Sequence, residues 1–206
     1  MKKIVFCDIP MKKQLDSMVY AGTGNTNISY DKAVIYPVNA ILAETLKKED
    51  EVKVVLLRTQ DKAGNSGVNS GKFMEELDKI NSEIGAKITY ETLDSEFKET
   101  KDNHETRLKA MLDKIDEGAQ LYADITFGPK PLPMILMCVL SFAEKFFNCD
   151  VKSVVYGKVT FDDNNTAGSP ELYDVTSLYY LNNLTYSMVA SDGKEARQNL
   201  DEFFSL

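Results

Sequence analysis

Tryptophan is absent from this sequence of 206 residues, histidine occurs once and cysteine occurs three times. The single histidine, His104, lies in a strongly charged stretch, so a catalytic Cys–His pair is not predicted. The cysteines Cys7, Cys138 and Cys149 are odd in number and form no C-x-x-C pair. This pattern is typical of reduced, buried thiols in a cytosolic protein, and it predicts no metal site.

Positive charge is also scarce, because the net charge of the chain is -8 at pH 7. Sequence-independent binding to duplex DNA or RNA depends on a basic surface, so the composition disfavours that function. Residues 1–48 nevertheless hold seven lysines against four acidic residues. A small anionic ligand near this part of the chain is therefore compatible with the overall acidity.

Long hydrophobic runs are absent as well. The most apolar segment, Leu132–Phe147, is interrupted by Glu144 and Lys145 and is too short to span a bilayer. The opening residues, MKKIVFCDIP, lack the long apolar core of a signal peptide. We therefore expect a soluble cytoplasmic protein without a membrane partner.

The hydrophobic residues that are present, 43% of the chain, are enough for one substantial domain. Short apolar runs typical of buried strands alternate with helical patterns. The expected strands are Lys3–Ile9, Val52–Arg58, Lys87–Leu93, Leu121–Thr126 and Val151–Gly157. Apolar residues at helical spacing indicate helices within Val34–Leu46, Phe73–Ile84, Leu108–Ile115 and the segment after Pro131. This alternation predicts an α/β fold with a Rossmann-like, mostly parallel sheet, helices on both faces and ligands at the carboxyl ends of strands.

The pattern changes after Gly157. Residues 158–176 are expected to form a loop or a hairpin, and helical patterns follow at 177–190 and 194–205. The sequence therefore predicts one Rossmann-like domain, residues 1–160, with a C-terminal helical appendage, residues 161–206, packed on the same domain.

The stretch Tyr20–Tyr30, YAGTGNTNISY, gathers glycines, threonines and asparagines between short β-type runs. Backbone N–H groups and small hydroxyls in such a loop suit a phosphate. Its core, Thr23–Thr26, resembles the phosphate loop of flavodoxins. In those proteins, however, the loop directly follows the first strand and caps a helix, and here no tryptophan could sandwich a flavin. A flavodoxin-like FMN protein is kept as an alternative, and no cofactor is predicted.

A second informative stretch, ADITFGPKPLPM at Ala123–Met134, follows a buried strand and breaks at Gly128 before a helix. Asp124, Thr126 and Lys130 are thereby expected at the carboxyl end of a strand and the start of a helix. A hydroxyl, an ammonium group and helix N-terminal amides together suit an anion. In the alternative interpretation Asp124 and Thr126 cap the turn and Lys130 is solvated, and the residues alone leave both interpretations open.

Together the two stretches resemble the CRISPR-associated Rossmann-fold (CARF) domain of type III CRISPR accessory proteins. The family's GTGN loop with a downstream tyrosine is matched by Gly22–Asn25 and Tyr30. Its strand–turn signature, close to D-[IV]-T-H-G-[FP]-[RK]-x-[LF]-P, is matched by DITFGPKPLP, with Phe127 where the family often has histidine. The segment VVYGKV follows in register, and order and spacing agree from Lys3 to about Val159.

The resemblance implies a homodimeric sensor in antiviral defence that binds cyclic oligoadenylate, with tetra-adenylate favoured, across its two-fold axis. The ligand-binding residues that it implies lie after the first strand, in the glycine loop and in the strand–turn signature: Ile9, Pro10, Met11, Lys12, Gly22, Thr23, Gly24, Asn25, Asp124, Thr126, Phe127, Gly128 and Lys130. The glycine loop would hold phosphate or ribose through backbone amides, and Lys130 would counter phosphate charge.

An effector activity is not predicted from the chain itself. The HEPN ribonuclease motif requires an arginine shortly before the histidine, and His104 has none at that distance. The E-x-K tripeptide at Glu96–Lys98 lies in a charged loop, and the cysteines do not form a deaminase zinc site. An effector domain or partner outside this chain is compatible with the family. The enzymatic alternative is a slow, metal-independent ring nuclease in which Thr126 orients the ligand and Lys130 stabilises charge, without an obvious general base.

Overall fold

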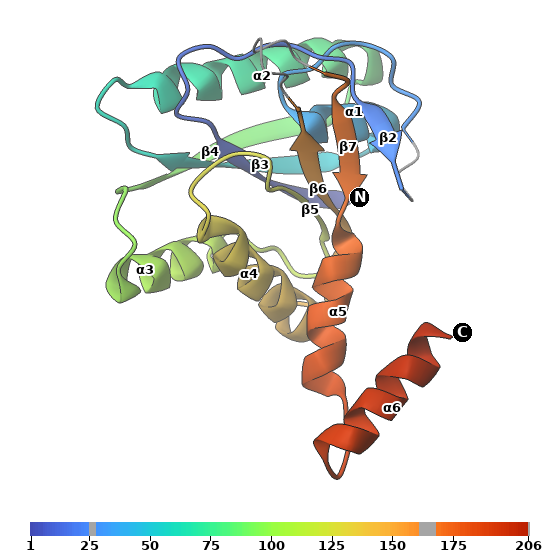
Figure 1. Ribbon diagram of the computed structural model, residues 1–206. Coiled ribbons are helices and arrows are strands. Elements are labelled where there is room, and N and C mark those ends of the chain that lie inside the picture. Colours follow the sequence, from blue (N-terminus) through green and yellow to red (C-terminus); the bar gives the residue numbers. More distant parts are fainter. Residues whose placement is uncertain (25–27, 161–167, 206) are drawn as a thin grey trace. The chain divides into compact units, whose positions relative to one another are not determined.

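The computed structural model describes residues 1–24, 28–160 and 168–205 (Figure 1). Its sheet has seven strands in the order β2-β7-β6-β5-β1-β3-β4. The strands are β1 (Lys2–Ile9), β2 (Ala21–Thr23), β3 (Glu51–Thr59), β4 (Lys87–Ser95), β5 (Gln120–Asp124), β6 (Asp150–Lys158) and β7 (Glu171–Asp174). Neighbouring strands are parallel except β6 and β7. The predicted α/β fold with a Rossmann-like, mostly parallel sheet is confirmed.

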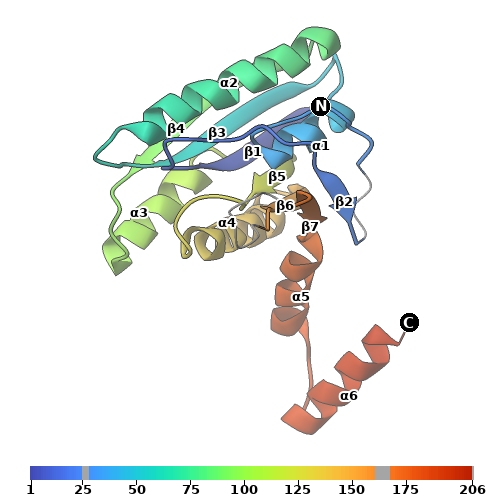
Figure 2. The same ribbon diagram turned by 45° about the horizontal axis from the view of Figure 1, so that its top comes forward.

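The connecting helices lie on both faces of this sheet. They are α1 (Pro37–Thr45), α2 (Asn65–Ile84), α3 (Lys101–Leu112) and α4 (Leu132–Phe146). α1 and α2 cover one face, and α3 and α4 cover the other, as the two views in Figures 1 and 2 agree. Because both faces of the central strands are covered, these strands read as near-continuous apolar runs in the sequence.

The core on the α1–α2 face is built around β1. Val5, Cys7 and Ile9 of this strand belong to one buried cluster with Tyr36 and Phe73, whose ring centroids are 4.9 Å apart. The helix expected from Val34 begins only at Pro37, after an extended residue. A residue before proline is disfavoured in the helical conformation, and proline itself suits the first helical turn.

The strand order places a topological switch point between β1 and β5. After β1 the chain first forms β2 at the far edge of the sheet, and it then passes through α1 to β3 and through α2 to β4, which both lie on one side of β1. It then returns through α3 to β5, on the other side. In parallel α/β sheets the carboxyl ends of strands at such a point leave a crevice for ligands.

The chain divides into two compact units, Met1–Thr176 and Ser177–Leu206. β7 pairs antiparallel with β6, so the segment expected as a loop or a hairpin supplies a strand of the sheet. The first unit therefore extends to Thr176, beyond the boundary at residue 160 that the sequence predicted. The helices near the C-terminus are α5 (Thr176–Ser187) and α6 (Gly193–Phe204). Among the helices of the described residues, none combines the length and the apolarity needed to cross a membrane.

Candidate functional site

A hollow of about 570 Å³, called here the switch-point pocket, opens beside the carboxyl ends of β1, β5 and β6. Its lining comes from the segment after β1, the turn after β5 and the end of β6. Several residues predicted from separate motifs line it together: Pro10, Met11, Lys12, Thr126, Phe127 and Gly128. The structure therefore brings the chain after the first strand and the DITFGPKPLP turn to the same hollow.

The described residues of the glycine loop, Gly22–Gly24, do not line this pocket. Gly22 and Thr23 lie in β2, which pairs in parallel with β7 at an edge of the sheet, and Gly24 follows with a φ of 69°. Asn25 lies outside the described residues. The excursion that carries the loop is closed at its base by two backbone hydrogen bonds between Met18 and Val34, of 2.9 and 2.8 Å.

The predicted residue Asp124 lies beneath the pocket and is only 1% exposed. Its carboxylate accepts hydrogen bonds from the backbone N–H of Val38, at 3.0 Å, and of Thr126, at 2.8 Å. Burial raises the pKa of Asp124, and these hydrogen bonds oppose that rise. The carboxylate thus caps the start of α1, so a flavin phosphate bound there as in flavodoxins would have to displace it.

Thr126 connects two of the pocket's walls. Its hydroxyl oxygen accepts the backbone N–H of Gly157 at 2.8 Å, and its side chain also hydrogen-bonds Asp124. These contacts match the interpretation in which Asp124 and Thr126 cap the turn. The Thr126 hydroxyl is therefore occupied by protein partners on two sides.

The helix entrance after this turn does not offer an anion site. The first amides of α4 donate to the carbonyls of Pro129 and Pro131 at 2.9 to 3.2 Å, and Pro133 has no N–H group. Lys130 is exposed and is not among the residues that line the pocket. Ile9, predicted with the same group, is 1% exposed and belongs to the core. The expected convergence of Lys130 with free helix amides is therefore not present among the described residues of the chain.

Several lining residues were missed by sequence reasoning, and two of them carry useful chemistry. Tyr156 is 40% exposed, and Lys158 forms an ion pair of 3.1 Å with Glu171. The remaining missed lining residues include Gln14, Leu15, Asp16, Met18, Tyr20, Ile35, Gly157 and Val159. Tyr156 and Lys158 are two residues apart at the end of β6, so their side chains project from the same face of the strand. Polar or aromatic residues at every second position of a strand's carboxyl end are the sequence signal that could have identified them.

Gly157 is required by the close approach of two neighbouring side chains. A Cβ atom at this position would lie 2.4 Å from Cγ of Pro37 and 3.1 Å from Cε1 of Tyr20. Both neighbours are buried. Tyr20 lines the switch-point pocket, and Pro37 opens α1, so this contact joins β6 to the first helix.

We expect Gly157→Ala to lower the free energy of unfolding by roughly 1–3 kcal/mol, because the proline ring has no flexible end that could move aside. Gly71→Ala is the matched control, since nothing lies within 4 Å of the corresponding Cβ position in α2. In a helix interior this control should stabilise by about 0.5–1 kcal/mol. Urea unfolding measures both, and equal stabilities of the two variants would contradict the contact.

Asp8 lies on the face of β1 opposite to Val5, Cys7 and Ile9. It is fully buried, next to the turn that follows β5. Neither carboxyl oxygen has a hydrogen-bond partner among the described residues, and a Cβ atom on Gly128 would lie 2.9 Å from Oδ2 of Asp8. Burial holds the pKa of Asp8 well above its usual range, the charge of Asp124 raises it further, and Arg107 opposes the rise. Folding therefore shifts the equilibrium of Asp8 toward its protonated form.

This burial predicts a pH dependence of stability. In the unfolded chain the pKa of an aspartate is about 3.9. Because the folded-state pKa is higher, the stability that Asp8 contributes is fully present below about pH 4 and is lost as the pH rises through the folded-state value. Asp8→Asn should remove this loss, so that the variant gains stability relative to wild type between pH 4 and 8 in urea unfolding. Asp31→Asn, at an exposed position, is the control, and parallel profiles for wild type and Asp8→Asn would refute the expectation.

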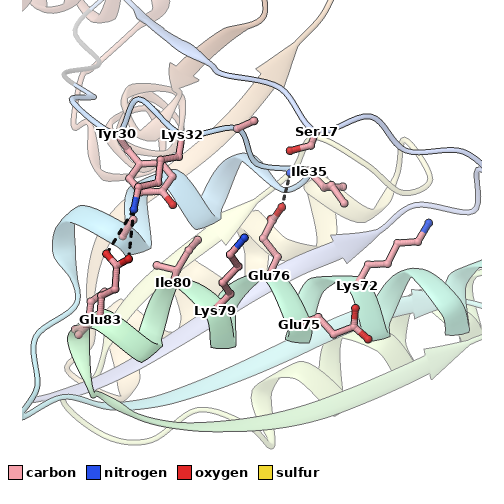
Figure 3. Close-up of a pocket in the computed structure, with 13 residues that line it drawn as sticks. Ser17, Tyr30, Lys32, Ile35, Lys72, Glu75, Glu76, Lys79, Ile80 and Glu83 are labelled. Atoms are coloured by element: carbon pink, nitrogen blue, oxygen red, sulfur yellow. Dashed lines mark hydrogen bonds and ion pairs between the residues drawn. The ribbon is translucent and has the colours of Figure 1, made fainter.

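A second hollow, of about 420 Å³, lies between α2 and the segment that precedes α1 (Figure 3). Glu76 of α2 accepts the backbone N–H groups of Ile35, at 2.6 Å, and Tyr36, at 3.2 Å. Tyr30, the downstream tyrosine of the glycine-loop motif, lines this hollow rather than the switch-point pocket, whereas Ile35 lines both. Figure 3 shows Lys79 extending from α2 into the same space.

The chain matches no protein-family model and no curated protein sequence. Its fold and pocket define a class: a Rossmann-like α/β protein with a hollow at the switch point of a mostly parallel sheet. The rim of that hollow combines aromatic side chains with lysines.

Proposed function

We propose that the protein is a sensor of type III CRISPR immunity that binds cyclic oligoadenylate in the switch-point pocket, at a homodimer interface. One observation carries the proposal. The pocket joins the segment after β1 to the turn of the DITFGPKPLP signature, and these are two of the separate segments that the CARF resemblance associates with the ligand.

The chemistry of the pocket rim suits a nucleotide. Lys12 is exposed, and its ammonium makes no hydrogen bond or ion pair with any residue that the structure describes, so this group is free to bind a phosphate. The ion pair of Lys158 with Glu171 is partly exposed to solvent, and ion pairs near the surface contribute little, so a phosphate can replace the carboxylate. Phe127 and Tyr156 offer aromatic rings on which adenine can stack.

The size of the pocket favours a shared ligand. Its volume of about 570 Å³ lies within the range of about 300–1,000 Å³ that suits a drug-sized molecule. A ring of four adenylates is larger than such a molecule, so one pocket would hold part of it. A second copy of the chain, related by a two-fold axis, would offer the same residues to the equivalent adenylates.

Lys12→Ala should weaken binding of cyclic tetra-adenylate by more than about tenfold, because a charge-assisted contact contributes roughly 1.5–3 kcal/mol. Isothermal titration calorimetry with purified protein measures this change. Lys48→Ala is the control, because this exposed lysine precedes β3 and lies at the amino ends of the strands. It should leave affinity unchanged.

Lys130→Ala makes the same experiment more informative. The ammonium of Lys130 lies outside the pocket of its own subunit, so a smaller effect than that of Lys12→Ala is expected. An equal loss would assign Lys130 to the ligand across the dimer interface. Absence of binding by the wild-type protein, for rings of four and of six adenylates, would reject the proposed function.

Incubating labelled cyclic tetra-adenylate with excess protein in EDTA distinguishes a ring nuclease from a protein that only binds the ligand. We expect the ring to remain intact, because the Thr126 hydroxyl is engaged by Gly157 and Asp124 and is not free to orient a ribose. Chromatography would detect a linear product. Its formation, and its loss in Thr126→Ala, would establish a metal-independent ring nuclease in place of a simple binder.

A further inference from the structure

Two asparagines of α2 hold three consecutive carbonyl groups of the switch-point pocket. The Asn69 side-chain amide donates to the carbonyl oxygens of Pro10, at 2.8 Å, and Lys12, at 2.9 Å. The Asn65 amide donates to the carbonyl of Met11 at 3.1 Å. The two asparagines are four residues apart and therefore lie on the same face of the helix.

This wall of the pocket has little other main-chain support. Within the described residues, segment 10–17 forms no hydrogen bond between its main chain and another main-chain group. It also contains no helix or strand. Backbone carbonyls that are shielded from water need a partner, and Asn69 supplies it for two of them. The path of the chain after β1 is therefore set by a side chain from a different element.

Asn69 is itself rigidly placed. The residue is only 1% exposed. Its main-chain carbonyl accepts a hydrogen bond from the hydroxyl of Tyr36 at 2.6 Å. Tyr36 is fully buried and packs edge-on against Phe73, one helical turn beyond Asn69. Both amide hydrogens of Asn69 are directed at carbonyl oxygens, and an asparagine amide has two donors. No other neutral side chain of this size provides the same pair of donors.

We propose that Asn69 is the positioning residue of the switch-point pocket: it fixes the turn Pro10–Lys12 so that Lys12 is presented at the rim. Asn69 does not itself line the pocket, so it acts on a ligand only through this turn. The expected effect of Asn69 on oligoadenylate binding rests on the proposed function. Its expected effect on the conformation of the turn Pro10–Lys12 does not depend on that function.

The test compares Asn69→Ala with Asn81→Ala, a matched variant in the same helix. Asn81 also makes two hydrogen bonds with main chain, donating to the carbonyl of Ala86 at 2.8 Å and accepting its N–H at 2.9 Å, but at the other end of α2. Two readouts are recorded at a temperature where every variant is folded. They are the methyl NMR signal of ¹³C-labelled Met11 and the affinity for cyclic tetra-adenylate by calorimetry.

Asn69→Ala should shift and broaden the Met11 signal and weaken ligand binding by about tenfold or more. Asn81→Ala should leave both unchanged, even where the two variants have similar melting temperatures. Asn69→Asp separates the loss of the hydrogen bonds from a change in side-chain size. It keeps the shape of the side chain but directs a carboxylate at the carbonyl oxygens of Pro10 and Lys12. It should reproduce the effects of Asn69→Ala.

An unchanged Met11 signal in Asn69→Ala, or the same shift in Asn81→Ala, would overturn the inference. If wild type binds no oligoadenylate, the proposed function fails, and the Met11 signal still decides the role of Asn69. If Asn69→Ala does not fold, Asn65→Ala provides the test. It removes only the bond to the Met11 carbonyl and should produce a smaller shift of the same signal, whereas an unshifted signal would reject the role of α2.

Discussion

The buried carboxylate of Asp124 is the contact on which the rest of the site depends. It joins the end of β5 to the first turn of α1 through Val38, and to its own turn through Thr126. Thr126 in turn accepts the N–H of Gly157 at the end of β6. Three elements that are distant in the sequence are therefore held at one edge of the sheet. The walls of the pocket are thus joined through one buried carboxyl group whose hydrogen bonds are satisfied locally.

This arrangement also determines where an anion can bind. Burial raises the pKa of Asp8, Asp124 and Glu76, so the interior near the pocket disfavours negative charge. The amides that might hold an anion at the starts of α1 and α4 are taken by Asp124 or by prolyl carbonyls. Positive charge remains at the rim, on Lys12 and Lys158. A phosphate is therefore expected to bind at the mouth of the hollow rather than at a helix N-terminus.

The architecture was predictable from the sequence, but parts of the site were not. Continuous apolar runs and helical spacing identified the central strands and the helices, because burial on both faces determines those patterns. The sequence predicts a phosphate-binding loop at Gly22–Asn25, yet residues Ala21–Thr23 pair with Glu171–Tyr173, about 150 positions later in the chain. Pairing between segments so far apart leaves no periodic signal near either one. The helix entrance next to Lys130 differs from the expected arrangement, since the prolines that begin α4 also remove or engage its free amides. The role of Lys130 itself stays a prediction.

Asn69 marks a further limit of sequence reasoning. A buried asparagine inside a helix is unfavourable by propensity, and the sequence gives no reason for it. Its reason is the turn that follows β1, whose carbonyls it satisfies from 57 or more residues away. A helix that covers the sheet thus also shapes the rim of the hollow. If the ligand is a symmetric ring, the same helix in each subunit would set the position of Lys12 on both sides of the axis, so a single internal contact would control two halves of one binding site.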